Sequence, residues 1–452
     1  MFSPETGYRL FPCRETTRLE GHFAIMDRAN SAENPAGFAH RAAITLQELD
    51  IPEAIVTELM VRRIYMDDKS DIESISRALR LSFPVVHSIF QRLREQQLIE
   101  VTGMSGNNYN FCLTSAGREL AERRLKVSQY CGPAPVSLQS YTAMVKAQIP
   151  KRALTREQLK TAMSDLVVTE EFLDQLGPAL ISQSSLFLYG PTGNGKTSVA
   201  VRLQRVYRDP ILIPYAVEFD GKIIVLYDPA VHNKVDDGEN GKEDLRWVLC
   251  ERPCIVVGGE LDISMLELQL DANSGVYAAP VQMKANNGIL VIDDFGRQIV
   301  APRNLLNRWI VPLDRRVDYL ALSYGVKFQI PFATMVVFAT NLDPQELADE
   351  AFLRRIRNHV YVEPCKPDLF DRIFDRLVVE NKLSSEPGSA ERLRALCLQA
   401  SGGQLRACYP LDILNIIASI SAYEQRPIHI TKADLERAAS IYFTKRLSRS
   451  AD

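Results

Sequence analysis

The chain has 452 residues, of which 46% are apolar and 24% charged, as in globular proteins of two or three domains. The formal net charge of −3 excludes a chain-wide basic field that would hold nucleic acid without sequence preference. No uncharged apolar run reaches about 18 residues, so we expect no membrane span. Eight cysteines, scattered singly, indicate reduced thiols and a cytoplasmic location rather than disulfides or a zinc site.

Residues 1–40 are polar and have no hydrophobic period, so we predict a disordered tail there. The first residues also lack the apolar region of a signal peptide. Met1 and Met26 are alternative translation starts, which an intact-mass measurement on the native protein distinguishes.

Residues 41–128 have the pattern of a small α+β domain. Apolar spacing predicts helices in "PEAIVTELMVRRIYM", in "DIESISRALRL" with Asp71 as N-cap, and in "SFPVVHSIFQRLREQQ" with Ser82 as a candidate cap and Pro84 in the first turn. A strand at "LIEV", a Gly/Asn turn, a returning strand and a fourth helix follow. This order of elements, with the stretch "YNFCLTSAGRELA", resembles the winged helix-turn-helix family.

The rest of the chain divides into three segments. Residues 129–158 contain prolines and few periodic apolar residues, so we predict a linker. From 159 to 365, short β-branched runs alternate with helical stretches, which predicts an α/β domain with a parallel sheet. Residues 366–448 contain four helical stretches, which predict a small helical domain.

The segment 190–197 reads G-x-x-x-x-G-K-T, between the apolar run "SSLFLY" and the helical stretch "TSVAVRLQRVY". A loop of this kind wraps backbone N–H groups around phosphates at a helix N-terminus, and that context makes a chance match improbable. Lys196 would reach the β- and γ-phosphates, and the Thr197 hydroxyl would bind Mg²⁺. We therefore expect ATP and Mg²⁺ as cofactors, with the nucleotide held by Gly190, Pro191, Thr192, Gly193, Asn194, Gly195, Lys196, Thr197 and Ser198.

A second apolar strand, "GILVIDDF" at 288–295, ends in two carboxylates. Asp293, at the strand end, is the expected Mg²⁺ ligand together with Thr197. Asp294 is placed to polarise the attacking water. The alternative is a structural aspartate pair that caps the strand.

The stretch "MVVFATNLDPQELADEAFLRRIRNHVYVEPCKPD" at 335–368 resembles the AAA+ ATPase family, and "DEAFLRR" is close to its katanin-like pattern. The resemblance implies a P-loop core with a helical lid. It places Asn341 at the sensor 1 position, where it would contact the γ-phosphate or the lytic water. It places Arg354 and Arg355 at the paired arginine-finger positions, which act on a neighbouring subunit's nucleotide. The alternative for both arginines is an exposed basic helix end.

Four further features bear on this resemblance. Many family members have glutamate at the position of Asp294, whose side chain is shorter by one methylene. "GGQLRA" places Arg406 in a G-x-x-R pattern similar to sensor 2, with a surface arginine as the alternative. The region leading into "ILVIDD" resembles the helix-2-insert clade, which includes MoxR-type ATPases, although the GAFTGA loop of one of its branches is absent. Residues 315–333 are expected to form the hairpin before sensor 1.

Three functions remain open. The first is a ring, expected to be a hexamer, that remodels a protein client through loops at 228–245 and 257–284, with the winged helix as a docking module. The second is a DNA-linked ATPase, whose winged helix would offer His87, Ser88, Gln91, Arg92 and Arg94 to the major groove and Asn107 and Asn108 on the wing. Residues 41–130 contain 12 Lys/Arg and 12 Asp/Glu, which disfavours this second reading. The third is a switch that binds ATP without turnover.

Overall fold

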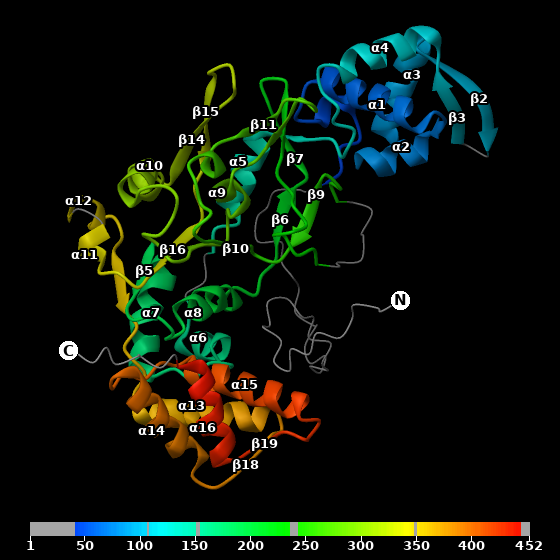
Figure 1. The fold of residues 1–452 in the computed structure, drawn as a ribbon. Coiled ribbons are helices and arrows are strands. Elements are labelled where there is room, and N and C mark those ends of the chain that lie inside the picture. The colour runs from blue at the N-terminus through cyan, green and yellow to red at the C-terminus, as the bar shows by residue number, and fades with distance from the viewer. Residues whose placement is uncertain (1–40, 106–107, 151–153, 236–242, 348–349, 444–452) are drawn as a thin grey trace, which may run out of the picture.

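The computed structural model describes residues 41–105, 108–150, 154–235, 243–347 and 350–443 (Figure 1). The tail predicted over 1–40, the choice between Met1 and Met26, and residues 444–448 of the predicted helical domain lie outside these ranges. Within them, no helix is long and apolar enough to cross a bilayer. The chain forms an N-terminal unit, a central region with two larger sheets, and a C-terminal helical unit (Figure 1).

The N-terminal unit packs helices against an antiparallel sheet of order β1-β3-β2. Asp71 Oδ1 accepts a hydrogen bond from Ser74 N (2.9 Å), which confirms the predicted N-cap of α2. Ser82 precedes α3, but its hydroxyl donates to Ala43 O and does not cap the helix. The elements, in the order that the sequence predicts and with a short β1 added, are η1 (Leu46–Glu48), α1 (Glu53–Asp67), β1 (Ser70–Asp71), α2 (Ile72–Leu79), α3 (Phe83–Glu95), β2 (Ile99–Ser105), β3 (Asn108–Leu113) and α4 (Ser115–Leu125).

A five-stranded sheet of order β10-β13-β16-β5-β17 forms the first central layer, and all its pairings are parallel. This confirms the α/β fold class. Its strands are β5 (Leu186–Tyr189), β10 (Cys254–Val257), β13 (Ile289–Ile292), β16 (Met335–Thr340) and β17 (Asn358–Tyr361). The helices and turns around it are α6 (Arg156–Ala162), α7 (Glu170–Ser182), α8 (Lys196–Arg202), η2 (Leu203–Val206), α10 (Pro302–Arg315), α11 (Pro344–Leu347) and α12 (Glu350–Leu353).

Helices cover both faces of this sheet because successive strand residues point to opposite sides. Leu186 and Leu188 pack on one face with buried residues of α6, α7 and α8. Phe187 and Phe338 pack on the other face with Trp309 of α10. The strands are therefore apolar throughout, which is why the sequence reveals them as uninterrupted hydrophobic runs.

A second sheet, of order β11-β12-β8-β7-β4, lies between the first sheet and the N-terminal unit (Figure 1). Two antiparallel strand pairs, β6 with β9 and the hairpin of β14 with β15, share its hydrophobic core. The sequence does not predict this sheet. Its elements are β4 (Val136–Ser137), α5 (Leu138–Ala147), β6 (Ile211–Pro214), β7 (Ala216–Phe219), β8 (Lys222–Val225), β9 (Trp247–Cys250), η3 (Ser264–Leu266), β11 (Gln269–Asp271), β12 (Val276–Ala278), α9 (Val281–Lys284), β14 (Val317–Ala321) and β15 (Lys327–Pro331).

Part of the predicted linker over 129–158 belongs to this second sheet. It contains β4 and α5; α5 buries Tyr141, Met144 and Val145, and of these Tyr141 and Val145 belong to the sheet's core. The spacing i, i+3, i+4 is helical, but the helix has only ten residues and follows a proline-rich stretch, so its pattern is short. Residues 257–284 also fold against this sheet through β11 and β12, and the predicted hairpin over 315–333 is confirmed as β14 and β15.

Two buried asparagines join the second sheet to the amino-terminal edge of the first. Asn286 Nδ2 donates to Tyr141 Oη (2.7 Å) and to Pro331 O (3.0 Å). Asn287 Nδ2 donates to Val145 O (2.8 Å), and Asn287 O accepts from Arg252 Nη1 (2.8 Å). These contacts fix α5 and β15 next to the residues that begin β13.

The C-terminal unit is a cluster of helices with its own hydrophobic core. The four predicted helices are present, and a short parallel pair, β18 with β19, joins two of the connections. Its elements are α13 (Pro367–Glu380), β18 (Ser384–Ser385), α14 (Ser389–Ser401), α15 (Tyr409–Tyr423), β19 (His429–Ile430) and α16 (Lys432–Tyr442).

Candidate nucleotide site

The glycine-rich segment 190–197 forms the turn between β5 and α8. Gly190, Gly193 and Gly195 have φ angles of 138°, 78° and 84°, which L side chains rarely adopt. A Cβ on Gly190 would lie 2.4 Å from Val362 O, so this position also needs glycine for space. Lys196 Nζ folds back and donates to Gly190 O (2.8 Å) and to Pro191 O (3.0 Å). The loop is thus curled around its own lysine, as a phosphate cradle requires.

Thr197 and Asp293 meet although 96 residues separate them in sequence. Thr197 Oγ1 lies 2.9 Å from both carboxylate oxygens of Asp293. Thr197 is in the first turn of α8, and Asp293 follows β13. A hydroxyl and one carboxylate suit Mg²⁺, which keeps several waters and binds phosphate oxygens besides a few protein ligands. The predicted metal ligands are therefore brought together. No cluster of three or more His, Cys, Asp or Glu side chains of metal-binding geometry occurs among the described residues.

Asp294 is exposed and has a left-handed backbone (φ 48°) that non-glycine residues seldom adopt. Its N–H donates to Asp293 Oδ1 (3.0 Å). The turn is held by Gln298, which is 9% exposed: its Nε2 donates to Asp293 O (2.9 Å) and its Oε1 accepts from Gly296 N (2.8 Å). Gln298 is a positioning residue that sequence reasoning missed, because a glutamine beyond the strand end belongs to no recognisable motif.

Asn341 follows β16, which lies between β13 and β5 in the sheet. Its Oδ1 is buried and has no hydrogen-bond partner among the described residues. Thr340 Oγ1, one residue earlier, donates to Phe295 O (2.7 Å) and ties this strand end to the turn after Asp293. A buried oxygen of this kind is normally satisfied by a donor, which a water or a bound group can supply.

The C-terminal unit contacts the glycine-rich loop directly. Cys408 N donates to Gly193 O (2.9 Å), and Ala407 N donates to Asn194 Oδ1 (3.2 Å). A Cβ on Gly193 would lie 2.8 Å from Cys408 Sγ. Arg406 is therefore next to the loop; its Nε is buried without a partner among the described residues.

The guanidinium of Arg406 also packs against an aromatic side chain. Its guanidinium carbon lies 5.8 Å from the centre of the Tyr409 ring. That ring packs edge-on against Tyr442 and Phe443 at the end of α16. This contact set could not be predicted from the sequence, because it joins residues whose spacing follows no motif.

Burial and charge act in opposite directions on Lys196. Burial lowers the pKa of Lys196, while the charges of Asp293 and Asp294 raise it. Partial loss of water strengthens the interaction of this ammonium group with an anion placed in the loop.

Arg354 and Arg355 are not brought to this site. Arg354 forms an ion pair with Glu350 (2.6 Å), and Arg355 forms one with Asp314 of α10 (2.7 Å). Figure 1 shows α12 at the periphery, apart from α8. Within one chain these arginines therefore do not contact the glycine-rich loop.

Comparisons with known proteins find one family match over part of the chain and several solved structures of low sequence identity. The sequence pattern of a family described as "Domain of unknown function (DUF8689)" matches residues 366–441, and no curated protein matches the chain. The RuvB Holliday junction branch migration motor from Thermotoga maritima is similar with 13% identity and a TM-score of 0.34, covering 65% of this chain and 72% of that one. NtrX from Brucella abortus in complex with ATP is similar with 15% identity and a TM-score of 0.37, covering 72% of this chain and 64% of that one. The fold assignment comes from the strand order and packing described above.

Proposed function

We propose that this chain is an ATPase of the AAA+ type, which binds Mg²⁺ and ATP between the glycine-rich loop, the end of β13 and the C-terminal helical unit. The contact of Thr197 with Asp293 beside the curled loop carries this proposal. Asn341 Oδ1 and Arg406 Nε support it, because both are buried without a hydrogen-bond partner among the described residues and lie next to the elements that would surround the γ-phosphate.

Each residue has a distinct role in this proposal. Lys196 would exchange its two carbonyl contacts for β- and γ-phosphate oxygens. Thr197 and Asp293 would hold Mg²⁺, which would supply positive charge next to the phosphates. Asp294 accepts a hydrogen bond from the attacking water, whose oxygen bonds the γ-phosphorus as the bond to the bridging oxygen breaks. Asn341 orients that water or the γ-phosphate. Because Asp294 is shorter than glutamate, its position depends on the turn that Gln298 holds.

The assembly that fits this chemistry is a ring, proposed to be a hexamer, in which Arg354 and Arg355 reach the neighbouring subunit's nucleotide. Mixing Arg355→Ala with Lys196→Ala subunits tests this. In equal mixtures, about a quarter of the interfaces join the intact loop of an Arg355→Ala subunit to the intact arginine of a Lys196→Ala neighbour. We expect turnover to reappear on mixing. Absence of recovery at every ratio, with assembly intact, would contradict supply from a neighbour.

We further propose that the motor acts on a protein client and that the N-terminal unit, as a winged helix, is a protein-docking module. Arg92, one of the candidate DNA contacts, is paired with Glu53. Asn108 is also occupied, since it donates to Asp71 Oδ1 (2.8 Å) and accepts from Ile72 N (3.1 Å). Asn107 lies outside the described residues.

Exposed apolar side chains on the same unit favour a protein partner over DNA. Phe83, Val101 and Met104 are 44%, 40% and 59% exposed, at the start of α3 and on the hairpin. DNA binding through this unit remains the second candidate, and a cytoplasmic location remains a prediction.

Steady-state ATP turnover by the whole chain tests the proposed function. We expect Lys196→Ala to lower kcat/KM by at least about 100-fold, because the site loses its phosphate cation. The control is Lys160→Ala on α6, whose exposed ammonium pairs with Glu170 (2.9 Å) and should leave turnover unchanged. Equal turnover in Lys196→Ala and the wild type would overturn the proposal. Stimulation by duplex DNA that salt abolishes would favour the DNA-linked candidate.

A further inference from the structure

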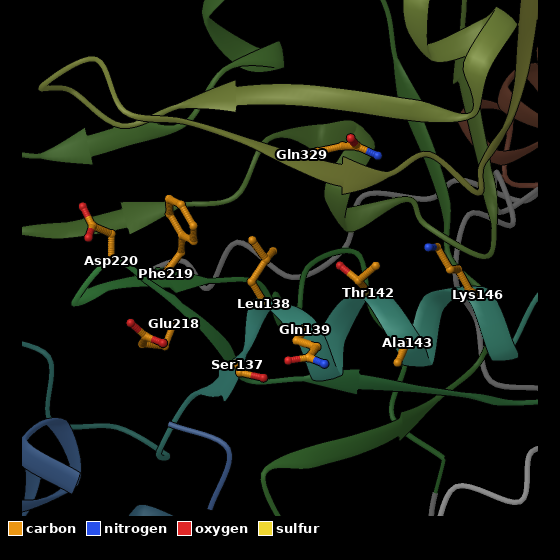
Figure 2. Close-up of a pocket in the computed structure, with 10 residues that line it drawn as sticks. All are labelled: Ser137, Leu138, Gln139, Thr142, Ala143, Lys146, Glu218, Phe219, Asp220 and Gln329. Carbon is orange, nitrogen blue, oxygen red and sulfur yellow. The ribbon is translucent and has the colours of Figure 1, made fainter. Parts of the chain in front are cut away.

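A hollow of about 660 Å³ lies beside α5 in the second sheet (Figure 2). α5 lies apart from α8 of the nucleotide site (Figure 1). α5 forms one wall, and β15 and the turn between β7 and β8 form the other. Figure 2 shows Glu218 and Asp220 at one end of α5 and Lys146 at the other. The volume is within the range of sites that hold small ligands or short peptide segments.

Glu218 is the unusual member of this lining. It is only 9% exposed, yet within the described ranges it forms no ion pair. Gly221 N donates to its Oε1 (2.9 Å), and no hydrogen bond among the described residues reaches its Oε2. Burial raises the pKa of Glu218, and the nearby charges of Asp50 and Asp220 raise it further. A buried carboxylate is normally paired with a cation, and no described residue forms an ion pair with Glu218.

The opposite end has the opposite charge. Lys146 is exposed and forms no ion pair with any described residue. It lies eight positions after Leu138, which is about 12 Å along a helix. Between the two ends, Thr142 and Gln329 offer hydrogen-bonding groups, and Leu138 and Phe219 offer apolar surface.

We propose that this hollow binds a short extended segment of a protein partner, with a basic side chain at Glu218 and an acidic side chain at Lys146. An extended chain advances about 3.3–3.6 Å per residue, so the two charges lie three or four positions apart in the partner. A single small cation would leave Lys146 and the middle of the hollow unused. The proposal goes beyond nucleotide hydrolysis and does not depend on it.

The test measures peptide binding to the whole chain by fluorescence anisotropy, without nucleotide. The probes are fluorescein-labelled, C-terminally amidated Ala-Arg-Leu-Ala-Ala-Glu-Ala and the reversed order Ala-Glu-Ala-Ala-Leu-Arg-Ala. We expect saturable binding of at least one probe, with Kd at or below about 1 mM. The version with glutamine in place of arginine and glutamate should not saturate.

Variants locate the binding. Glu218→Gln should weaken it by at least about tenfold, because a charge-assisted contact is lost while the hydrogen bond from Gly221 can remain. This variant should fold, since it removes an unpaired buried charge. Lys146→Gln should weaken binding less, because Lys146 is exposed. The matched control is Glu251→Gln at the end of β9, an exposed carboxylate bonded to Asn233 (3.2 Å), which should change Kd by less than about twofold.

Three results would overturn the proposal. The first is no saturation by either probe, and the second is unchanged binding to Glu218→Gln. The third is displacement of the probe by free L-arginine at a concentration equal to the Kd of the probe. That result would make the hollow a site for small cations. None of these results bears on ATP turnover, so failure here is separate from failure of the ATPase proposal.

Discussion

At the scale of single residues, the candidate site contains buried polar atoms that have no hydrogen-bond partner within the described part of the chain. Asn341 Oδ1 is buried without a donor among the described residues, whereas the neighbouring Thr340 hydroxyl is satisfied by Phe295 O (2.7 Å). An unsatisfied buried oxygen costs stability, and a satisfied one contributes to it. The two adjacent residues therefore have opposite expected effects on stability and activity.

Replacing Asn341 by Ala should lower kcat by about 10–100-fold and leave the free energy of unfolding equal to or above that of the wild type. The matched control is Thr340→Val, which leaves Phe295 O unpaired and should destabilise the chain by about 1–3 kcal/mol. Urea unfolding and ATP turnover measure the two effects. Marked destabilisation by Asn341→Ala would show that this amide has a structural partner instead of a ligand.

At the scale of elements, the sequence predicts best those strands and turns whose chemistry is local. The loop 190–197, the strand before Asp293 and the parallel sheet are visible because buried strands are unbroken apolar runs and glycine is required at set positions. The second sheet escapes prediction because its strands have two to four residues and join segments far apart in sequence. Gln298 and Tyr409 escape for a related reason, since their roles exist only after the turn and the helix are in place.

The start of α15 illustrates how one element supports another's function. Tyr409 faces Arg406 with its ring (5.8 Å) and packs on Tyr442 and Phe443 of the chain's last described helix and turn. Tyr409→Leu should raise the KM for ATP by about 3–10-fold while kcat changes less, because Arg406 loses one side of its support. Tyr423→Leu, at the exposed end of the same helix (84% exposed), is the control and should leave both constants unchanged. Equal effects from the two variants would refute a positioning role for Tyr409.

At the scale of the whole molecule, the N-terminal unit is attached to the second sheet by a buried ion-pair network. Arg246 is 5% exposed, and its Nη1 donates to Asp50 Oδ1 (2.8 Å) and to Pro135 O (3.0 Å). Asp244 pairs with the same guanidinium (2.7 Å). Apolar contacts of the N-terminal core with Ala216 and Ile223 complete this junction.

This junction should weaken in acid. Although burial opposes it, the pairing with Arg246 and hydrogen bonds from Ser140 and Ser137 lower the pKa of Asp50 from 3.8 to about 2. The resulting stabilisation, about 2 kcal/mol, is present above pH 3.8 and is lost as the pH falls toward 2.

Comparing Asp50→Asn with the wild type by urea unfolding checks this. The difference in unfolding free energy should be largest near pH 7 and shrink between about pH 4 and 2. The control is Asp68→Asn, which changes an exposed carboxylate 3.8 Å from Arg118. Its unfolding free energy should differ little from that of the wild type at any pH. If the difference in unfolding free energy between Asp50→Asn and the wild type stayed constant down to pH 2, the lowered pKa of Asp50 would be contradicted.

The bonds from Asn286 and Asn287 to α5 and β15 have a mechanical consequence. They lie at the amino-terminal edge of the parallel sheet, while Thr197, Asp293 and the C-terminal unit meet at its carboxyl edge. A rotation of the C-terminal unit about Gly193 would leave these bonds intact, so the second sheet would move together with the parallel sheet. Because the N-terminal unit lies beyond the second sheet, a small change of angle at the nucleotide site would then displace it over a large distance relative to the C-terminal unit.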